Sequence, residues 1–416
     1  MKRVLHISTS DIGGAANVCI TIHNELIVNG YGSNVLTLLR TRSTTGIEQY
    51  NEYKKAGKIG IAYEHYKSFL LPWIFSKLLK DQEKKHEAFT FPYSLIDITK
   101  HPFYNEADII QLHYASYLVN WKTFFAKNTK PIVWTLHDMN VFTGGCHHSE
   151  DCIGYLEQCG DCPQLKESWL PNLPEAMLRM KKNALSGNIT FVSPSKWLMN
   201  KAQSSTLLQK QDIRFISNGI DLNMFKKRNK ELSRIKHNLP INKKIILFLI
   251  DDFSRYNKGF FLFIDSIKYI KDSNDIFYIF IGNNAKNIDN YVKDFVCFPY
   301  IVSEFQLSEL YSSADLLVLP SKYENCPLTV MESMACGTPV VSFNAAGQKD
   351  MIEHTENGYL ANPYDTISFA KGITYCLDEK NHSKLSINCE IKAKNEYSSK
   401  KMFDSYKSLY NEIIHE

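Results

Sequence analysis

The stretch DLLVLPSKYENCPLTVMESMACGTPVVSF, residues 315–343, contains the pattern that decides the fold. Its first apolar run predicts a buried strand, and the run at its end, Pro339–Phe343, predicts a second one. Between the two strands, Pro327 suits the start of a helix, with Asn325 as a candidate cap, and Gly337 suits its end. A strand, a helix and another strand in this order indicate an α/β protein.

The same alternation runs through the whole chain. Uniformly apolar strands are typical of a parallel sheet that is covered on both faces. Because 416 residues exceed what one core normally holds, we expect two doubly wound units in series. The predicted strands are Arg3–Ser8, Asn34–Leu39, Asp108–Tyr114, Pro131–His137 and Ile189–Ser195, followed by Lys244–Ile250, Phe277–Gly282, Asp315–Pro320 and Pro339–Phe343.

The predicted domain boundaries follow from turns and from one segment that fits the alternation poorly. The turn at Asn218-Gly219 marks the join, which gives a first domain over 1–215 and a second over 216–395. The last segment, 396–416, is a predicted helix whose apolar stripe should dock on another part of the protein. The insert at about 45–105 is either a solvated helix with a core face or a surface that meets a membrane or an acceptor.

Composition excludes several classes of protein. A net charge of +4 and a hydrophobic fraction of 44% are ordinary for a globular enzyme and give no reason to expect nucleic-acid binding. No run approaches the ~20 apolar residues that a membrane span needs. The start MKRVLHIST does not have the pattern of a signal peptide, so we expect a cytoplasmic protein, at most at the inner face of the membrane.

Two carboxylates flank the predicted helix start. Glu324 is expected in the loop after the strand, and Glu332 about one and a half turns inside the helix, on the order of 8–12 Å away. That separation excludes a shared-proton pair at ~3 Å and a retaining glycosidase pair at ~5–5.5 Å. It suits two-point binding of one long ligand through hydroxyl groups. Alternatively, Glu324 is a partner of the helix dipole and Glu332 a solvated helix residue.

The same block, ENCPLTVME followed by SMACGTPVV, resembles the E-x7-E signature of the retaining glycosyltransferases of family 4, which have the GT-B fold. Further resemblances follow in the order of that family from about residue 10 to about residue 365. They are the glycine loop SDIGGAANV, the strand-end segment VSPSKWL, the interdomain turn ISNGIDLNMF and the stretch AAGQKDMIEHTENGYLANPYD.

The resemblance implies two Rossmann-like domains facing across a cleft, with the last helix crossing back to the first domain. Residues 1–215 would bind the acceptor and residues 216–395 the nucleotide sugar. The implied reaction moves a hexose from a UDP- or GDP-sugar to a hydroxyl acceptor, such as a lipid-linked or growing surface glycan, with retention at the anomeric carbon. No cofactor is implied for catalysis.

Residue by residue, the resemblance gives roles in binding the donor. Glu324 would touch the donor hexose, with a role in catalysis, and Glu332 would bind the ribose hydroxyls. Lys258 matches a lysine that faces the diphosphate, whereas Arg255 is displaced from the usual place of the family's arginine. The segment expected to approach the sugar and the distal phosphate is Asn325, Cys326, Leu328 and Thr329.

The first domain contributes fewer expected site residues. Gly13 and Gly14 lie in a loop that the resemblance places beside the phosphates and the acceptor, although GGAANV is not a full G-x-G-x-x-G pattern. His137 resembles a strand-end histidine that contacts the donor sugar, and His113 has a similar position. A lone histidine after an apolar strand is more often structural, so both interpretations stay open.

Four cysteines lie close together in the loop at 145–165. Cys146, Cys152, Cys159 and Cys162 have the spacing C-x5-C-x6-C-x2-C, which contains one C-x2-C pair. They could bind a structural zinc ion, with the neighbouring histidines 147 and 148 as substitute ligands, form disulfides, or remain plain thiols.

Two other functions are alternatives to the transferase. A GT-B-like nucleotide-sugar epimerase would need a second acid–base pair near the anomeric carbon. A catalytically silent partner subunit of a transferase complex would be expected to lack Glu324, Glu332 or Lys258, and all three are present.

Overall fold

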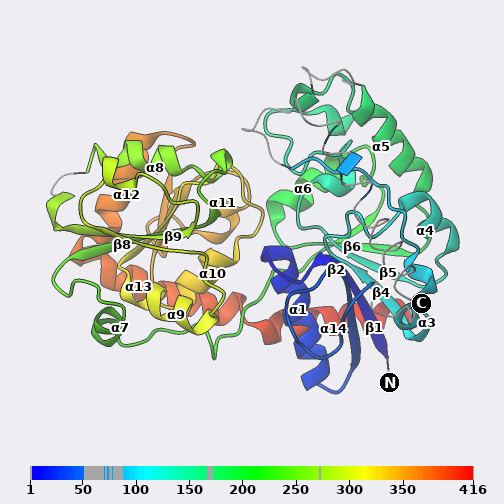
Figure 1. Ribbon diagram of the computed structural model, residues 1–416, viewed down its shortest axis with the longest axis horizontal. Helices are drawn as coiled ribbons and strands as arrows, with labels where there is room; N and C mark the ends of the chain where they lie inside the picture. The colour runs from blue at the N-terminus through cyan, green and yellow to red at the C-terminus, as the bar shows by residue number, and fades with distance from the viewer. Residues whose placement is uncertain are drawn as a thin grey trace. The chain divides into compact units, whose positions relative to one another are not determined.

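The protein was analysed as a computed structural model that describes residues 2–50, 88–165, 172–270 and 273–415, with 70, 73, 74 and 77 in addition. The chain divides into two compact units. The first comprises Met1–Ser217 and Met402–Glu416, and the second comprises Asn218–Lys401. Each unit contains one parallel sheet with helices on both faces, which is the predicted α/β architecture of two doubly wound units (Figure 1).

The sheet of the first unit has seven strands in the order β3-β2-β1-β4-β5-β6-β7, and all its pairings are parallel. The five predicted strands are present. Sequence reasoning missed the two edge strands, of which β3 is short and β7 largely exposed. The strands are β1 (Arg3–Ser10), β2 (Gly32–Leu39), β3 (Ile47–Gln49), β4 (Ile109–Leu112), β5 (Ile132–Thr135), β6 (Ile189–Ser193) and β7 (Asp212–Phe215).

Helices cover both faces of this sheet (Figure 1). Side chains that alternate along β1, β4 and β5 pack on one face against the buried sides of α3 (Pro102–Glu106), α4 (Trp121–Lys127), α5 (Leu173–Ala184) and α6 (Lys196–Ser204). The opposite face is covered by α1 (Gly14–Val28) and α14 (Ser399–His415).

The docking of α14 confirms the prediction from its apolar stripe. Two tyrosine hydroxyls fix the helix to the sheet: Tyr406 Oη lies 2.9 Å from Thr135 Oγ1, and Tyr410 donates to the Gln111 side-chain oxygen. The predicted stripe is buried throughout and consists of Met402, Phe403, Tyr406, Leu409, Tyr410 and Ile413.

The sheet of the second unit has six strands in the order β10-β9-β8-β11-β12-β13, again all parallel. The four predicted strands are present, and the two that the sequence did not reveal are again the edges. The strands are β8 (Lys244–Asp252), β9 (Ile276–Asn283), β10 (Phe295–Phe298), β11 (Leu316–Leu319), β12 (Val340–Phe343) and β13 (Gly358–Ala361).

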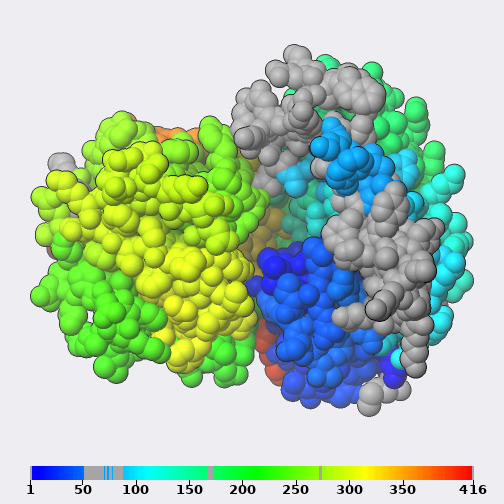
Figure 2. Space-filling view, viewed as in Figure 1, coloured from blue at the N-terminus to red at the C-terminus, as the bar shows by residue number. Residues whose placement is uncertain are grey.

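Successive side chains of these strands alternate between two cores. One core lies against α8 (Phe260–Ile267) and α12 (Thr366–Leu377). The other lies against α9 (Glu304–Ser313), α10 (Leu328–Ala335) and α13 (Glu379–Glu396). The outer side of α9 reaches the surface (Figure 2, yellow). The remaining helices are α7 (Lys230–Lys236) and the single turn α11 (Gln348–Met351).

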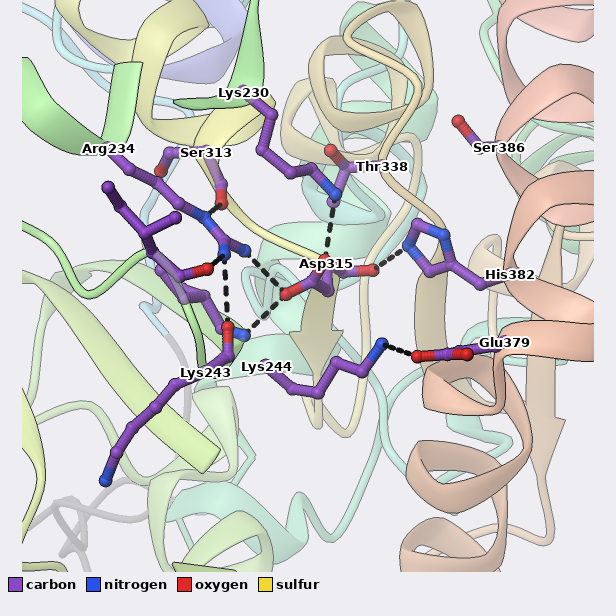
Figure 3. Close-up of polar contacts among 12 residues, drawn as sticks. Lys230, Arg234, Lys243, Lys244, Ser313, Asp315, Thr338, Glu379, His382 and Ser386 are labelled. Atoms are coloured by element: carbon purple, nitrogen blue, oxygen red, sulfur yellow. Dashed lines mark hydrogen bonds and ion pairs between the residues drawn. The ribbon is translucent and has the colours of Figure 1, made fainter. Parts of the chain in front are cut away.

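A buried ion-pair network fixes the amino-terminal edge of this second sheet (Figure 3). Asp315, directly before β11, accepts hydrogen bonds from Arg234 Nη2 at 2.8 Å and from Lys230 Nζ at 2.8 Å. His382 of α13 approaches from the other side, with its Nε2 3.0 Å from the Asp315 carbonyl oxygen. The network therefore ties α7 and α13 to the edge opposite the one where β11 leads into Glu324.

The insert predicted at about 45–105 is described only in part. Residues 47–49 form β3, and 98–106 form a short 3-10 helix followed by α3. The aromatic and basic stretch between them, on which the expected membrane or acceptor surface depends, lies largely outside the described residues. Within the part of the chain that the structure describes, no helix is both long and apolar enough to span a membrane.

Candidate functional site

The candidate donor site is the loop that joins β11 to α10. Pro320 follows the strand, and α10 begins at Leu328 with Pro327 as its N-cap, without a side chain that caps it. The expected cap by Asn325 is therefore wrong, because that residue lies two positions before the N-cap. The helix ends as predicted, with Gly337 in the left-handed region at a φ of 73°. The first turn of α10 thus presents backbone N–H groups at the carboxyl end of the sheet.

Two glycines allow neighbouring loops to approach this segment closely. Gly259 has a φ of 74°, and a Cβ there would overlap the Pro320 carbonyl oxygen. A Cβ on Gly347 would overlap the carbonyl oxygen of Asn325. The Gly347 N–H also donates to the Glu324 carbonyl oxygen at 2.8 Å. Residue 259 follows Lys258, so the close packing of Gly259 brings that lysine to the loop.

Lys258 and Glu324 form an ion pair, which brings together two of the predicted catalytic residues. Lys258 Nζ lies 2.7 Å from Glu324 Oε1, and the two side chains are only 18% and 16% exposed. The Glu324 backbone N–H donates to Gln348 Oε1 at 3.3 Å, which orients the loop. The arrangement is a half-buried, charge-neutral pair at the carboxyl end of β11.

Glu332 points into the protein. Its carboxylate accepts a hydrogen bond of 2.8 Å from the Tyr311 hydroxyl and is 8% exposed. Burial raises the pKa of Glu332 from 4.5 to about 7, while the bond from Tyr311 opposes this rise. The alternative interpretation as a solvated helix residue is therefore wrong. Glu332 is a buried acid that changes its charge near neutral pH.

The other residues predicted to bind the donor make contacts of their own, apart from the pair of Lys258 and Glu324. Arg255 lies in the loop after β8, where its Nη1 pairs with Asp251 at 2.7 Å on the surface of the second unit. The Cys326 carbonyl oxygen accepts a bond of 3.3 Å from Asn218 Nδ2 of the predicted interdomain turn. Leu328 and Thr329 form the first turn of α10.

The predicted glycine loop lies in the first unit, at the start of α1. Gly13 is the N-cap of this helix with a φ of 98°, and Gly14 is its first residue. Among the described residues, a Cβ on either glycine would meet no atom within 4 Å. The backbone at this helix start is therefore open to a ligand, although the packing alone does not require a glycine at position 14.

A row of three histidines runs inward from the carboxyl end of β5. His137 Nε2 lies 3.1 Å from His113 Nδ1, and His113 Nε2 lies 3.3 Å from His6 Nδ1. Burial lowers the pKa of His137 to about 4, and burial also moves the pKa values of His113 and His6 well below their usual range. The row therefore consists of neutral imidazoles joined by hydrogen bonds at neutral pH.

A pocket lies beside this row. His113, His137 and Asp138 line it together with Trp134 and Tyr114. It lies at the carboxyl ends of β4 and β5, where parallel α/β sheets commonly bind ligands.

Sequence reasoning missed Asp138 as a site residue. Its Oδ2 lies 2.7 Å from His147 Nδ1, and the other nitrogen of that ring, Nε2, lies 3.0 Å from Thr90 Oγ1. Burial would raise the pKa of Asp138, but His147 and the hydrogen bonds outweigh burial and lower it to about 2. The sequence contained one indication of this role, since Asp138 directly follows the predicted site residue His137 at the end of a strand. Both ring nitrogens of His147 are engaged, so it does not act as a substitute zinc ligand here.

The four clustered cysteines line one pocket in the first unit. All ten cysteines of the chain are free thiols, so the disulfide alternative does not hold in this structure. Among the described residues, the ligand atoms of His6, Cys19 and His113 lie within 4.8 Å of one another, whereas no three of the clustered sulfur atoms do so.

Comparison with known proteins gives a family match in the second unit. Residues 229–395 match the family described as glycosyl transferases group 1. The chain is 24% identical over 236 residues to N-acetyl-alpha-D-glucosaminyl L-malate synthase of Bacillus anthracis, covering 54% of this chain and 60% of that protein.

A second relative is UDP-Gal:alpha-D-GlcNAc-diphosphoundecaprenol alpha-1,3-galactosyltransferase of Escherichia coli. It is 24% identical over 211 residues, covering 49% of this chain and 54% of that protein. The chain thus matches little more than half the length of these two relatives.

Among solved structures, Anabaena Alr3699/HepE in complex with UDP and glucose has a TM-score of 0.65 at 16% identity, covering 99% of this chain and 100% of that one. At this identity the likeness shows the fold alone, and it covers both units. The two parallel sheets and the likeness to this structure show the GT-B fold, and residues 229–395 of the second unit match the glycosyl transferases group 1 family.

Proposed function

We propose that this enzyme moves a hexose from a nucleoside-diphosphate sugar to a hydroxyl acceptor, with retention at the anomeric carbon. The observation that carries the proposal is the pair of Lys258 and Glu324, 2.7 Å apart beside the start of α10. A lysine, a carboxylate and free helix N–H groups at one strand end form a suitable environment for a sugar joined to a diphosphate.

In the proposed mechanism, the donor opens this ion pair. Lys258 turns from Glu324 to the diphosphate and stabilises the negative charge that develops as the bond to the sugar breaks. The Glu324 carboxylate is then released to accept hydrogen bonds from the hexose hydroxyls or to stabilise positive charge at the anomeric carbon. The N–H groups of Leu328 and Thr329 supply further donors to the phosphate. A charge-neutral resting pair keeps either charge from remaining half-buried and unpaired before the donor binds.

Glu332 is proposed to hold the ribose. A carboxyl group can accept two hydrogen bonds from neighbouring hydroxyls, and when protonated it can donate one. The Tyr311 hydroxyl fixes the Glu332 carboxyl in place at 2.8 Å, so one oxygen is already oriented before the nucleotide arrives. Arg255 would have to leave Asp251 to reach a phosphate. We therefore propose that Arg255 contributes less to phosphate binding than Lys258 does.

The acceptor is proposed to bind in the first unit, in the pocket beside His137. Its lining combines aromatic rings with the Asp138 carboxylate and the His137 imidazole, which suits a sugar ring with hydroxyl groups. His137, neutral at the pH of the cell, would act as a hydrogen-bond partner of a sugar hydroxyl. The Escherichia coli relative is named for a diphosphoundecaprenol acceptor, which supports a lipid-linked glycan and binding at a membrane surface for this enzyme.

Two comparisons support UDP as the nucleotide of the donor. One relative is named for UDP-Gal, and one structural neighbour was solved with UDP and glucose. An epimerase would require a second acid–base pair beside Glu324. Among the described residues, the charged partner of Glu324 is Lys258, which suits a diphosphate better than it suits an epimerase. The silent-subunit alternative is disfavoured by the family match and by the presence of all three charged residues.

The proposal is tested by measuring slow hydrolysis of labelled UDP- and GDP-sugars together with the binding of UDP and GDP. Replacing Lys258 by Ala should lower turnover by about 10²–10³-fold, because a positioned charge at the leaving group is lost. The matched control is Lys268→Ala, an exposed lysine of the same unit that pairs with Asp265. Unchanged turnover in Lys258→Ala, or release of a sugar epimer in place of free sugar, would refute the assignment.

A further inference from the structure

The four cysteines of the first unit surround one pocket that the proposed transfer reaction does not use. Cys146, Cys152, Cys159 and Cys162 line it together with Phe89 and other apolar or backbone groups. Burial raises the pKa of the Cys146 thiol. Cys159 and Cys162 are buried, and Cys146 and Cys152 are half-buried. Four thiols around one space have no evident task as packing groups alone, since alkyl side chains would fill that space better.

Backbone N–H groups point at two of the four sulfur atoms. Gly154 donates to Cys152 Sγ at 3.4 Å, and Gly144 donates to Cys159 Sγ at 3.3 Å. A sulfur atom bound to a metal ion is a thiolate, which accepts such hydrogen bonds more strongly than a thiol does, so these N–H groups suit sulfur ligands of a metal.

A buried cation lies beside the cluster. The Lys181 side chain is fully buried, and its ammonium donates to the carbonyl oxygens of Asn140 and Thr143, the latter at 3.0 Å. Cys146 and Cys159 are among its electrostatic neighbours. Burial of an ammonium group is costly unless negative charge lies nearby. The Asp138 carboxylate supplies part of that charge, and a set of thiolates held by a divalent ion would add to it.

The loop that carries the cysteines has an unusual backbone. Glu150, Cys159 and Asp161 have φ values of 51°, 58° and 47°, in the left-handed region that residues other than glycine rarely adopt. Such residues persist only where the surroundings hold them. In the described part of this loop, the regular structure consists of short 3-10 helices, which are too small to impose this geometry alone.

We propose that Cys146, Cys152, Cys159 and Cys162 bind one structural zinc ion as four thiolates, with Lys181 as the buried counter-charge. Tetrahedral coordination at ~2.3 Å from zinc to sulfur places the sulfur atoms about 3.8 Å apart. The sulfur atoms stand wider than that in this structure, so zinc would draw the loop closed and release the thiol protons. The ion would thereby fix the segment that carries Asp138 and His147 beside the acceptor pocket.

The first test is the zinc content of the full chain, purified without chelator and measured by elemental analysis. We expect about one zinc ion per chain in the unaltered protein and well under one in Cys162→Ser. The matched control is Cys19→Ser, which alters the other group of potential ligands, His6, Cys19 and His113, and should keep its zinc. Absence of zinc from the unaltered protein, or loss of zinc from Cys19→Ser alone, would overturn the proposal.

A second measurement uses the unaltered protein, so it tests the proposal even if Cys162→Ser does not fold. Cobalt(II) added to zinc-depleted unaltered protein should give the sulfur-to-metal charge-transfer and visible absorption of a tetrahedral thiolate site. Four thiols should become reactive on metal removal and protected again on reloading. Lys181→Met should weaken zinc binding by about 10–100-fold in competition with a chelator, as the loss of outer-shell partners typically does. A disulfide, or thiols equally reactive with and without metal, would contradict the site.

Discussion

At the scale of single residues, pairing decides what each charged group of the candidate site can do. The sequence predicted that Glu324 and Glu332 lie on either side of a helix start, because their eight-residue spacing and the surrounding pattern are both local. It could not predict that Lys258 would meet Glu324, since these residues are far apart in the sequence and come together through the packing of Gly259. The burial of Lys181 was equally unpredictable from the sequence, because a lysine in an amphipathic helix normally faces solvent.

Glu332 makes the stability of the second unit depend on pH. The pKa of Glu332 is about 7 in the folded protein and 4.5 when the side chain is exposed. Below pH 4.5 the carboxyl is therefore neutral in both the folded and the unfolded state, and its burial does not lower the free energy of unfolding. As pH rises from 4.5 to 7, the unfolded state loses its proton first, and folding is weakened by at most about 3 kcal/mol. Glu332→Gln should therefore become more stable than the unaltered protein as pH rises through this range.

The measurement is urea denaturation of both proteins at pH 4.5 and pH 8. The difference in free energy of unfolding should grow with pH in favour of the glutamine variant. Glu379→Gln, at a side chain that is 87% exposed, is the control and should show no such growth. A pH-independent difference for Glu332→Gln would show that the buried carboxyl titrates normally.

At the scale of elements, sequence patterns revealed strands according to their burial. All nine predicted strands are present, and the four that were missed, β3, β7, β10 and β13, are the edges of the two sheets. An interior strand of a parallel sheet is covered on both faces and reads as one apolar run. Edge strands such as β7 and β10 have few buried side chains, so nothing in their composition distinguishes them from loops.

The loop at the carboxyl end of β11 should be sensitive to a single added methyl group. In Gly259→Ala, the new Cβ both occupies a left-handed backbone and overlaps the Pro320 carbonyl oxygen. We expect a loss of about 3 kcal/mol or more in stability and a weaker affinity for UDP, because Lys258 moves with the loop.

Gly187→Ala separates the two causes of this loss. That glycine has a φ of 95°, but a Cβ there meets no atom of the described residues within 4 Å. The substitution therefore adds backbone strain of about 1–2 kcal/mol without a clash. Denaturation and calorimetric titration with UDP would compare the two variants. Equal losses of stability in both would show that the contact with Pro320 is unimportant.

At the scale of the whole molecule, the sequence predicted two α/β units and a docking helix at 396–416. Periodicity alone did not say where that helix docks, whereas the resemblance to the glycosyltransferase family implied its return to the first domain, to which residues 402–416 belong. The structure places α14 on the first sheet through the hydroxyls of Tyr406 and Tyr410. These contacts join residues far apart in the sequence, which is why no local pattern reveals them. The predicted cleft between the domains remains a prediction.

Removing the two hydroxyls tests how firmly α14 is held. Tyr406→Phe and Tyr410→Phe should each lower the free energy of unfolding by roughly 1–3 kcal/mol, because Thr135 and Gln111 lose partners in a buried setting. Tyr269→Phe, at an exposed position of the second unit, is the control. Thermal and urea unfolding would measure the effect, and a change no larger than that of the control would mean that apolar contacts alone dock the helix.

The position of α14 also orders events during synthesis of the protein. The first unit is assembled from Met1–Ser217 and Met402–Glu416, and the ribosome makes the entire second unit between these two segments. The sheet face that carries Gln111 and Thr135 therefore remains without its covering helix while the entire second unit is made. The first unit should therefore complete its folding only after the second unit has been made. Nascent chains released before residue 402 should retain an uncovered sheet face that binds chaperones.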